Sequence, residues 1–150
     1  SSLVGDQLER RYREKPYAYF GPVIRRARAV SIVDIEPDLE SRLSDPELDE
    51  LMLLDVLVRG RAAQYPETPE VWLAVEVSAS VDRADVERAR RRAALLRKAG
   101  YLAIPTVAGE RATRGGAQAA REQNVFLVQD GRKEFWEAAL AAALADGGGS

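Results

Sequence analysis

The run from Val71 to Val81 constrains the fold most, because it is the clearest strand in the chain. Its odd positions from Val71 to Val77 are all apolar, so they form one face of a strand and the even positions form the other. Glu76 lies on this second face and interrupts a strand that otherwise suits a protein interior. A buried carboxylate is costly unless a cation or strong hydrogen-bond donors satisfy it. Glu76 is therefore a candidate functional residue.

The rest of the chain predicts a mixed β-sheet flanked by α-helices, which is an α/β domain. A first helix ends near Pro16, Asp82 caps the helix over 83–99, and Pro105 places its strand at a sheet edge or bends it. The expected helices cover 3–14, 45–50, 83–99, 112–122 and 132–146, and the expected strands cover 30–35, 51–59, 71–81, 101–108 and 125–128, with a loop at 60–69 and a turn at 130–131. This order predicts right-handed crossovers in the second half of the chain.

Length and hydropathy predict one intracellular domain. The chain has 150 residues, enough to bury a continuous core. Residues 1–146 are expected to form the domain, whereas 147–150 and the two leading serines resemble linker or tag residues. No stretch approaches the roughly 20 apolar residues of a membrane helix, and the N-terminus lacks a secretory signal pattern. We therefore expect a cytoplasmic protein without a membrane partner.

The chain contains neither cysteine nor histidine, which excludes several kinds of chemistry. Disulfides, thiol nucleophiles and thiolate metal sites need cysteine, while serine–histidine triads and imidazole zinc sites need histidine. Only carboxylate, lysine, arginine and hydroxyl groups remain for catalysis.

Charge is strongly segregated along the chain, although the net charge is only −2. Residues 9–28 carry seven basic and two acidic side chains, and residues 83–98 also carry seven and two. Residues 34–50 carry eight acidic side chains and one arginine. Two basic surfaces of this kind can bind a polyanion. The alternative is that the acidic segment neutralises the basic ones within the fold.

Asp55 resembles Glu76, because it also interrupts a run of apolar residues that reads as a strand. If the two strands are neighbours, both carboxylates can converge on one hard cation such as Mg²⁺, which takes oxygen ligands and keeps several waters. The alternative is that each acid pairs with arginines of the same chain, Asp55 with Arg59 or Arg61 and Glu76 with Arg88 or Arg92.

These residues resemble the PD-(D/E)xK superfamily of restriction-endonuclease-like nucleases. The similar order is a helix with an internal acid (Glu9), Asp55 in one strand, Glu76 in the next, then a helix and a further strand. Within the superfamily, an uncharacterised prokaryotic branch looks similar in five short runs: 19–21, 55–61, 75–78, 85–89 and 107–109. The resemblance covers about residues 5–131.

The resemblance implies roles for particular residues. Asp55 and Glu76 match the metal-binding acids, and Glu9 matches an acid that some members add to the site. Ser78 stands where the family pattern has a lysine, and serine supplies no fixed positive charge for the transition state. Arg88 or Arg92 could provide that charge instead.

The leading hypothesis is therefore a nuclease, a metal-dependent phosphodiesterase that cleaves DNA with Mg²⁺ or Mn²⁺ and is slow without the lysine. Its phosphate-backbone contacts would come from two basic regions, 10–28 and 83–98, with Arg88, Arg91, Arg92 and Arg61 as the main candidates. The alternative is a nuclease-like module that has lost catalysis and binds nucleic acid or protein. The alanine-rich helix at 132–146 is expected to dock on the domain, and a homodimer contact through it stays open.

Overall fold

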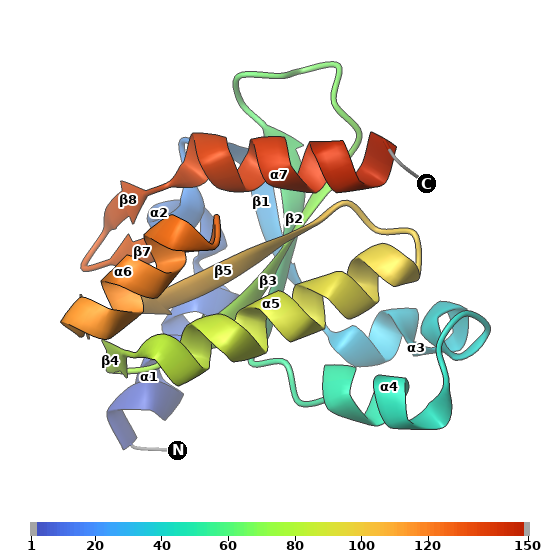
Figure 1. Cartoon of the computed structure of the whole chain (residues 1–150), viewed down its shortest axis with the longest axis horizontal. Coiled ribbons are helices and arrows are strands. Elements are labelled where there is room, and N and C mark those ends of the chain that lie inside the picture. The colour runs from blue at the N-terminus through green and yellow to red at the C-terminus, as the bar shows by residue number, and fades with distance from the viewer. Residues whose placement is uncertain (1–2, 149–150) are drawn as a thin grey trace.

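The computed structural model describes residues 3–148, which form a mixed sheet covered by helices on both faces (Figure 1). The helices are α1 (Leu3–Glu14), α2 (Pro16–Phe20), α3 (Ile32–Glu40), α4 (Asp45–Leu51), α5 (Arg83–Lys98), α6 (Arg114–Glu122) and α7 (Trp136–Gly148). The strands are β1 (Ile24–Val30), β2 (Val56–Ala62), β3 (Val71–Val77), β4 (Ser80–Val81), β5 (Ala103–Gly109), β6 (Arg111–Ala112), β7 (Phe126–Gln129) and β8 (Arg132–Glu134).

The main sheet has six strands in the order β1-β2-β3-β5-β7-β8. β1, β2 and β3 are antiparallel neighbours, β3, β5 and β7 run parallel, and β8 returns antiparallel to β7. The prediction of a mixed α/β sheet flanked by helices is confirmed. β3 lies where the antiparallel half of the sheet meets the parallel half, so Glu76 lies at the centre of the fold.

The two faces of β3 pack against different helices. Val71, Leu73 and Val75 join a core with side chains of α1, α2 and α7, as the alternating pattern predicts. Trp72 and Ala74 on the other face join a core with side chains of α3, α4 and α5. Glu76 follows these two residues on the α5 face. Its carboxylate is therefore covered by α5 and shielded from solvent.

The helix after β3 has strong end signals, and the sequence predicted it within one residue. Asp82 accepts a hydrogen bond from the Asp85 N–H, and the Asp85 carboxylate accepts one from the Asp82 N–H, which forms a capping box. Gly100 follows the helix with φ of 98°, a left-handed conformation that favours glycine. The buried stripe of α5 contains the expected Val86, Ala89, Ala93 and Leu96.

Two strands lie elsewhere than predicted in the first half of the chain. The strand expected at 51–59 begins only at Val56, because α4 continues through Leu51 and a turn follows it. Asp55 therefore lies just before β2 rather than within it. The strand expected at 30–35 is instead β1, over 24–30, and Ile32 and Ile35 pack from α3 against the second core. Their apolar spacing fits a helix as well as a strand.

Three further expectations in the second half need correction. The strand expected at 71–81 ends at Val77, and 80–81 pairs with β6 in a separate small sheet. β5 is neither an edge strand nor exposed, and Pro105 is tolerated there because β7 pairs with β5 only from Thr106 onward. Residues 132–134 form β8 after the turn at 130–131, so the last helix starts at Trp136.

The last helix continues through Gly147 and Gly148, where the sequence predicts a linker. The leading serines and residues 149–150 lie outside the described residues. Trp136 and Leu140 are buried, so the predicted docking of this helix on the domain is confirmed. Along residues 3–148, the structure has no helix with the length and apolar character needed to cross a membrane.

We expect Gly109→Ala to destabilise the protein, because a Cβ at this position would overlap the backbone oxygen of Ser78. Overpacking of this kind costs about 1 to 3 kcal/mol. Gly115→Ala is the matched control, since a Cβ there meets nothing within 4 Å and Gly115 lies in α6. It should change stability little or raise it by up to about 1 kcal/mol. Urea denaturation of both variants tests this, and equal stability would contradict it.

Candidate functional site

Asp55 and Glu76 meet where β2 begins and β3 ends. Val56 lies opposite Val75 in the antiparallel pair, which brings the two acids to the same end of the sheet. The Val77 N–H donates to Oδ2 of Asp55 at 2.8 Å, and the Asp55 N–H donates to Oε2 of Glu76 at 3.4 Å. Each carboxylate thus accepts a hydrogen bond from the backbone of the other strand.

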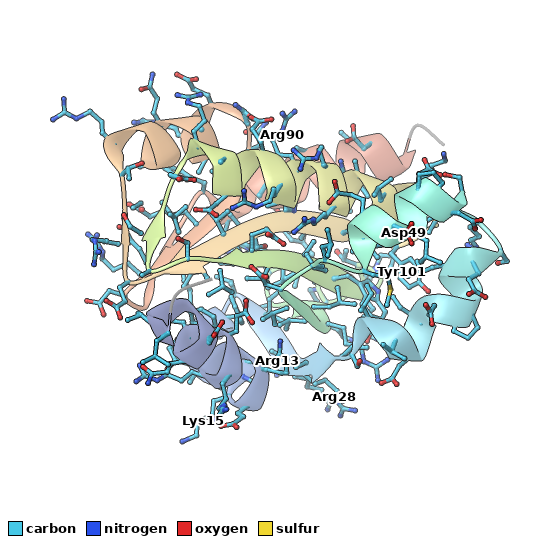
Figure 2. All side chains as sticks on the ribbon, turned by 90° about the horizontal axis from the view of Figure 1, so that it is seen from below. Arg13, Lys15, Arg28, Asp49, Arg90 and Tyr101 are labelled. Carbon is cyan, nitrogen blue, oxygen red and sulfur yellow. The ribbon has the colours of Figure 1, made fainter. Side chains whose placement is uncertain are left out.

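A cavity of about 340 Å³ opens at this end of the sheet, and it brings the predicted site residues together. Figure 2, which views the molecule from below, shows α1 on one side of the strands and α5 on the other. The lining residues come from α1, β2, β3, α5 and the segments next to them: Gly5, Glu9, Asp55, Glu76, Val77, Ser78, Ala79, Asp85, Arg88 and Arg92.

Glu9 reaches the cavity from α1 and is hydrogen-bonded to the Asp55 side chain. Burial raises the pKa of Glu9 to about 7, and the charge of Asp55 and the hydrogen bond to it act in the same direction. The guanidinium of Arg13 opposes this rise. The Glu9 carboxyl therefore keeps its proton to a higher pH than an exposed glutamate does.

Glu76 is almost completely buried, with 2% of its surface exposed, and it is neutralised by arginines. Its Oε1 lies 2.8 Å from Nη1 of Arg92 and 3.4 Å from Nε of Arg88. Burial and the charge of Asp55 raise the pKa of Glu76, while the hydrogen bond from Arg92 lowers it in part. Arg92 is itself buried and also binds Glu50, with Nε 2.9 Å from its Oε2.

The pairing alternative is thus confirmed for Glu76 and is wrong for Asp55. Arg59 pairs with Glu70 at 3.8 Å, and Arg61 makes no ion pair within the described part of the chain. The arginine that reaches Asp55 is Arg13, which donates from Nη2 to the backbone oxygen of Asp55 at 2.9 Å. The sequence missed this contact, because 42 positions separate the two residues.

Ser78 lies in the cavity, but its hydroxyl is uncharged, and its Oγ donates to the backbone oxygen of Ser80 at 3.0 Å. Arg88 is the more accessible of the two cations in the cavity, with 38% of its side chain exposed. It is held by ion pairs to Glu76 and Asp85. Arg88 is therefore the cavity cation that solvent or a ligand can reach.

Asp85 also lines the cavity, but the sequence did not single it out as a site residue, although it begins the short run 85–89. Only 4% of its surface is exposed, and burial raises its pKa. The hydrogen bond from the Asp82 backbone lowers this pKa in part, while the charge of Asp82 raises it. Its spacing from Asp82 is the signature of a capping box, which accounts for the acid without a functional role. Its place in the cavity becomes evident only from the structure, in which Asp85 forms an ion pair with Arg88 beside Glu76.

The donor types of the cavity suit a hard cation, because Asp55, Glu76 and Glu9 all offer carboxylate oxygens. Among residues 3–148, no group of three or more acids is arranged so that it could hold a metal ion. A magnesium site needs only one or two carboxylates, since the ion keeps several waters. Asp55 and Glu76 offer oxygens of the type that such a site uses, but both oxygens of Glu76 already have partners in Arg92, Arg88 and the Asp55 N–H.

The predicted DNA contacts do not form one surface. Arg92 is buried with its side chain 7% exposed and cannot reach a phosphate backbone. Arg91 is exposed but lies 3.6 Å from Glu50, and Arg61 lies at the far end of β2 from Asp55, opposite Arg25.

Comparisons with protein-family models, with curated proteins and with solved structures found no match.

We expect Arg92→Met to destabilise the protein by about 3 to 5 kcal/mol, because it leaves Glu76 buried without its closest cation. Adding Glu76→Gln to this variant removes the uncompensated charge and should recover part of the loss. Chemical denaturation of wild type, Arg92→Met and the double variant measures the coupling. Additive effects of the two substitutions would show that the pair contributes nothing.

We expect carboxyl NMR to show Glu9 titrating near pH 7. Asp55→Asn should lower this pKa without restoring the ordinary 4.5, because burial is the largest cause of the rise. The folded protein holds this proton more tightly than the unfolded chain, so stability should fall as pH rises from about 4.5 to about 7. Glu9→Gln should flatten that fall. A wild-type Glu9 that titrates near 4.5 would contradict the raised pKa of this carboxyl.

Proposed function

We propose that this protein is a metal-dependent phosphodiesterase, a nuclease that acts on DNA in the cytoplasm with Mg²⁺ or Mn²⁺. The observation that carries the proposal is the convergence of Asp55 and Glu76, from adjacent strands, on one cavity that also contains Glu9. Buried acids that a fold gathers from separate elements are more typical of a functional site than of a structural one.

The order of elements supports the same proposal. A helix carrying Glu9 precedes three antiparallel strands, then α5 and the parallel strand β5 follow. The resemblance to the PD-(D/E)xK superfamily implies a leading helix, two strands that carry the acids, a helix and a further strand. The observed order agrees with this, except that Asp55 lies just before its strand. We accordingly propose a restriction-endonuclease-like fold.

In this proposal, Asp55 and Glu76 hold the metal ion, and Glu9 supplies a further acid beside Asp55. A bound Mg²⁺ would activate water for attack and neutralise charge on the phosphate. Arg88 takes the role of the lysine that Ser78 replaces, because it is the exposed cation at the cavity. Arg92 positions Glu76 from the interior and does not touch substrate.

Activity should be slow, because Arg88 is shared between Glu76 and Asp85. A guanidinium in two ion pairs is less free to stabilise charge that develops on a phosphate. A metal ion would also compete with Arg92 and Arg88 for Glu76.

That competition supports a second candidate, a nuclease-like module that binds nucleic acid or protein without cleaving it. In such a module, Arg92 takes the place of the metal and satisfies Glu76 permanently. The two candidates differ in whether a divalent ion displaces the internal cation.

We expect wild type to nick plasmid DNA slowly, and faster with Mn²⁺ than with Mg²⁺. Glu76→Ala should abolish nicking, since it removes a metal ligand from the centre of the cavity. Ser78→Lys should raise the rate, because the new ammonium projects from the strand two residues after Glu76. The measurement is divalent-dependent nicking of plasmid and cleavage of single-stranded and branched DNA.

Glu122→Ala is the matched control, because Glu122 is an exposed acid on α6 outside the cavity. It should nick DNA as wild type does. If wild type, Glu76→Ala and Ser78→Lys are equally inactive while wild type still binds DNA, the second candidate is correct.

A further inference from the structure

The protein has two basic surfaces, and they lie on opposite sides of the molecule. In the view of Figure 2, Arg90 of α5 lies on one side of the molecule, and Arg13, Lys15 and Arg28 lie on the other. We define the α1–β1 surface as the basic residues around the β1 edge of the sheet. Three come from α1, which covers one sheet face, and a lysine directly follows it, while three strand residues lie on the other face, with Arg26 at the bulge of β1: Arg10, Arg11, Arg13, Lys15, Arg25, Arg28, Arg61 and Arg26.

The basic residues of α5 are mostly neutralised by acids of the same chain. Arg91 and Arg92 bind Glu50 of α4, which belongs to the acidic segment 34–50. The other pairs on α5 join Arg88 to Glu76 and Asp85, Arg90 to Glu87, Arg97 to Asp146 and Lys98 to Glu47. The positive charge of α5 therefore serves the fold, and little of it is left for an external polyanion.

The α1–β1 surface has no such compensation. All eight of its basic residues are exposed, and none makes an ion pair within residues 3–148. In the β1–β2 register, Arg25 lies opposite Arg61, and neither makes an ion pair with a described residue, whereas Arg28 lies opposite Arg59, which is paired with Glu70. Like charges that face each other across strands are destabilising. An external anion would relieve this repulsion.

The surface is continuous with the candidate site through Arg13. Besides its bond to the Asp55 backbone, Arg13 lines a second cavity of about 420 Å³ that also reaches Asp55, Ala29 and Val30. From Asp55 to Arg61 the chain runs about 20 Å along β2 at 3.3 Å per residue. That length corresponds to about six steps of a DNA strand at 3.4 Å each.

We propose that the α1–β1 surface, and not α5, binds the phosphate backbone of the nucleic acid whose strand enters the Asp55–Glu76 cavity. This inference rests on the proposed function, because it assigns the substrate surface of the same site. Unpaired cations, a like-charge pair in register and contact with Asp55 through Arg13 occur together only there among the described residues. The arginines would contact phosphates without reading sequence.

The test is fluorescence anisotropy with a labelled DNA duplex of about 20 base pairs, over a range of salt concentrations. Arg25→Gln/Arg28→Gln removes two charges from β1, and Arg90→Gln/Arg91→Gln removes two from α5. The β1 variant should weaken binding at least tenfold and lower the salt slope by about two units. The α5 variant should change affinity less than twofold. Arg25→Lys/Arg28→Lys keeps the charge and should retain the salt slope.

Equal losses in the two glutamine variants, or a larger loss in the α5 variant, would overturn the proposal. Charged residues on an edge strand also prevent strand pairing between molecules. If Arg25→Gln/Arg28→Gln binds DNA like wild type but self-associates in gel filtration, those arginines protect the edge and the proposal is wrong.

Divalent-dependent nicking is measured separately from DNA binding. Loss of DNA binding in the β1 variant with no divalent-dependent nicking by wild type would support this surface and reject the nuclease.

Discussion

The ion pair between Glu76 and Arg92 connects the parts of the structure on which the site depends. Arg92 extends from α5 to Glu76 on β3 and to Glu50 on α4, and it also donates to the backbone oxygen of Leu53 at 3.3 Å. One guanidinium thus joins the central strand to the turn that leads into Asp55. A buried pair of this kind adds little net stability, because desolvation offsets the attraction. Its contribution is to fix the position of Glu76 directly and that of Asp55 through the turn at Leu53.

The same contacts explain the charge pattern of the chain. The acidic helix α4 supplies the counterions of α5, so two segments that look like separate surfaces in the sequence neutralise each other in space. The first basic segment meets no comparable acidic helix. A charge run therefore indicates an external partner only after its internal pairs are known.

The sequence predicted the elements with two-fold alternation or clear caps, and it failed where short apolar runs had no boundary signal. The helix that follows Asp82 and the apolar face of β3 were predicted correctly, because their periods are unambiguous. Ile32 and Ile35 were misplaced, since a short apolar run fits a strand or a helix. For the site, Asp55, Glu76 and Glu9 could be named, whereas their partners could not, because Arg13 and Arg92 reach them from far along the chain.

The two backbone bonds between Asp55 and Glu76 also have a consequence for how the sheet assembles. Each acid accepts from the N–H of the opposite strand segment, so both bonds form only when β2 and β3 pair in one alignment. A slip of one residue would move Glu76 to the face that packs against α1 and α7, where its charge would lie among valines. The carboxylates therefore penalise misaligned pairing. The two acids of the candidate site thus also favour the correct alignment of the strands beside them.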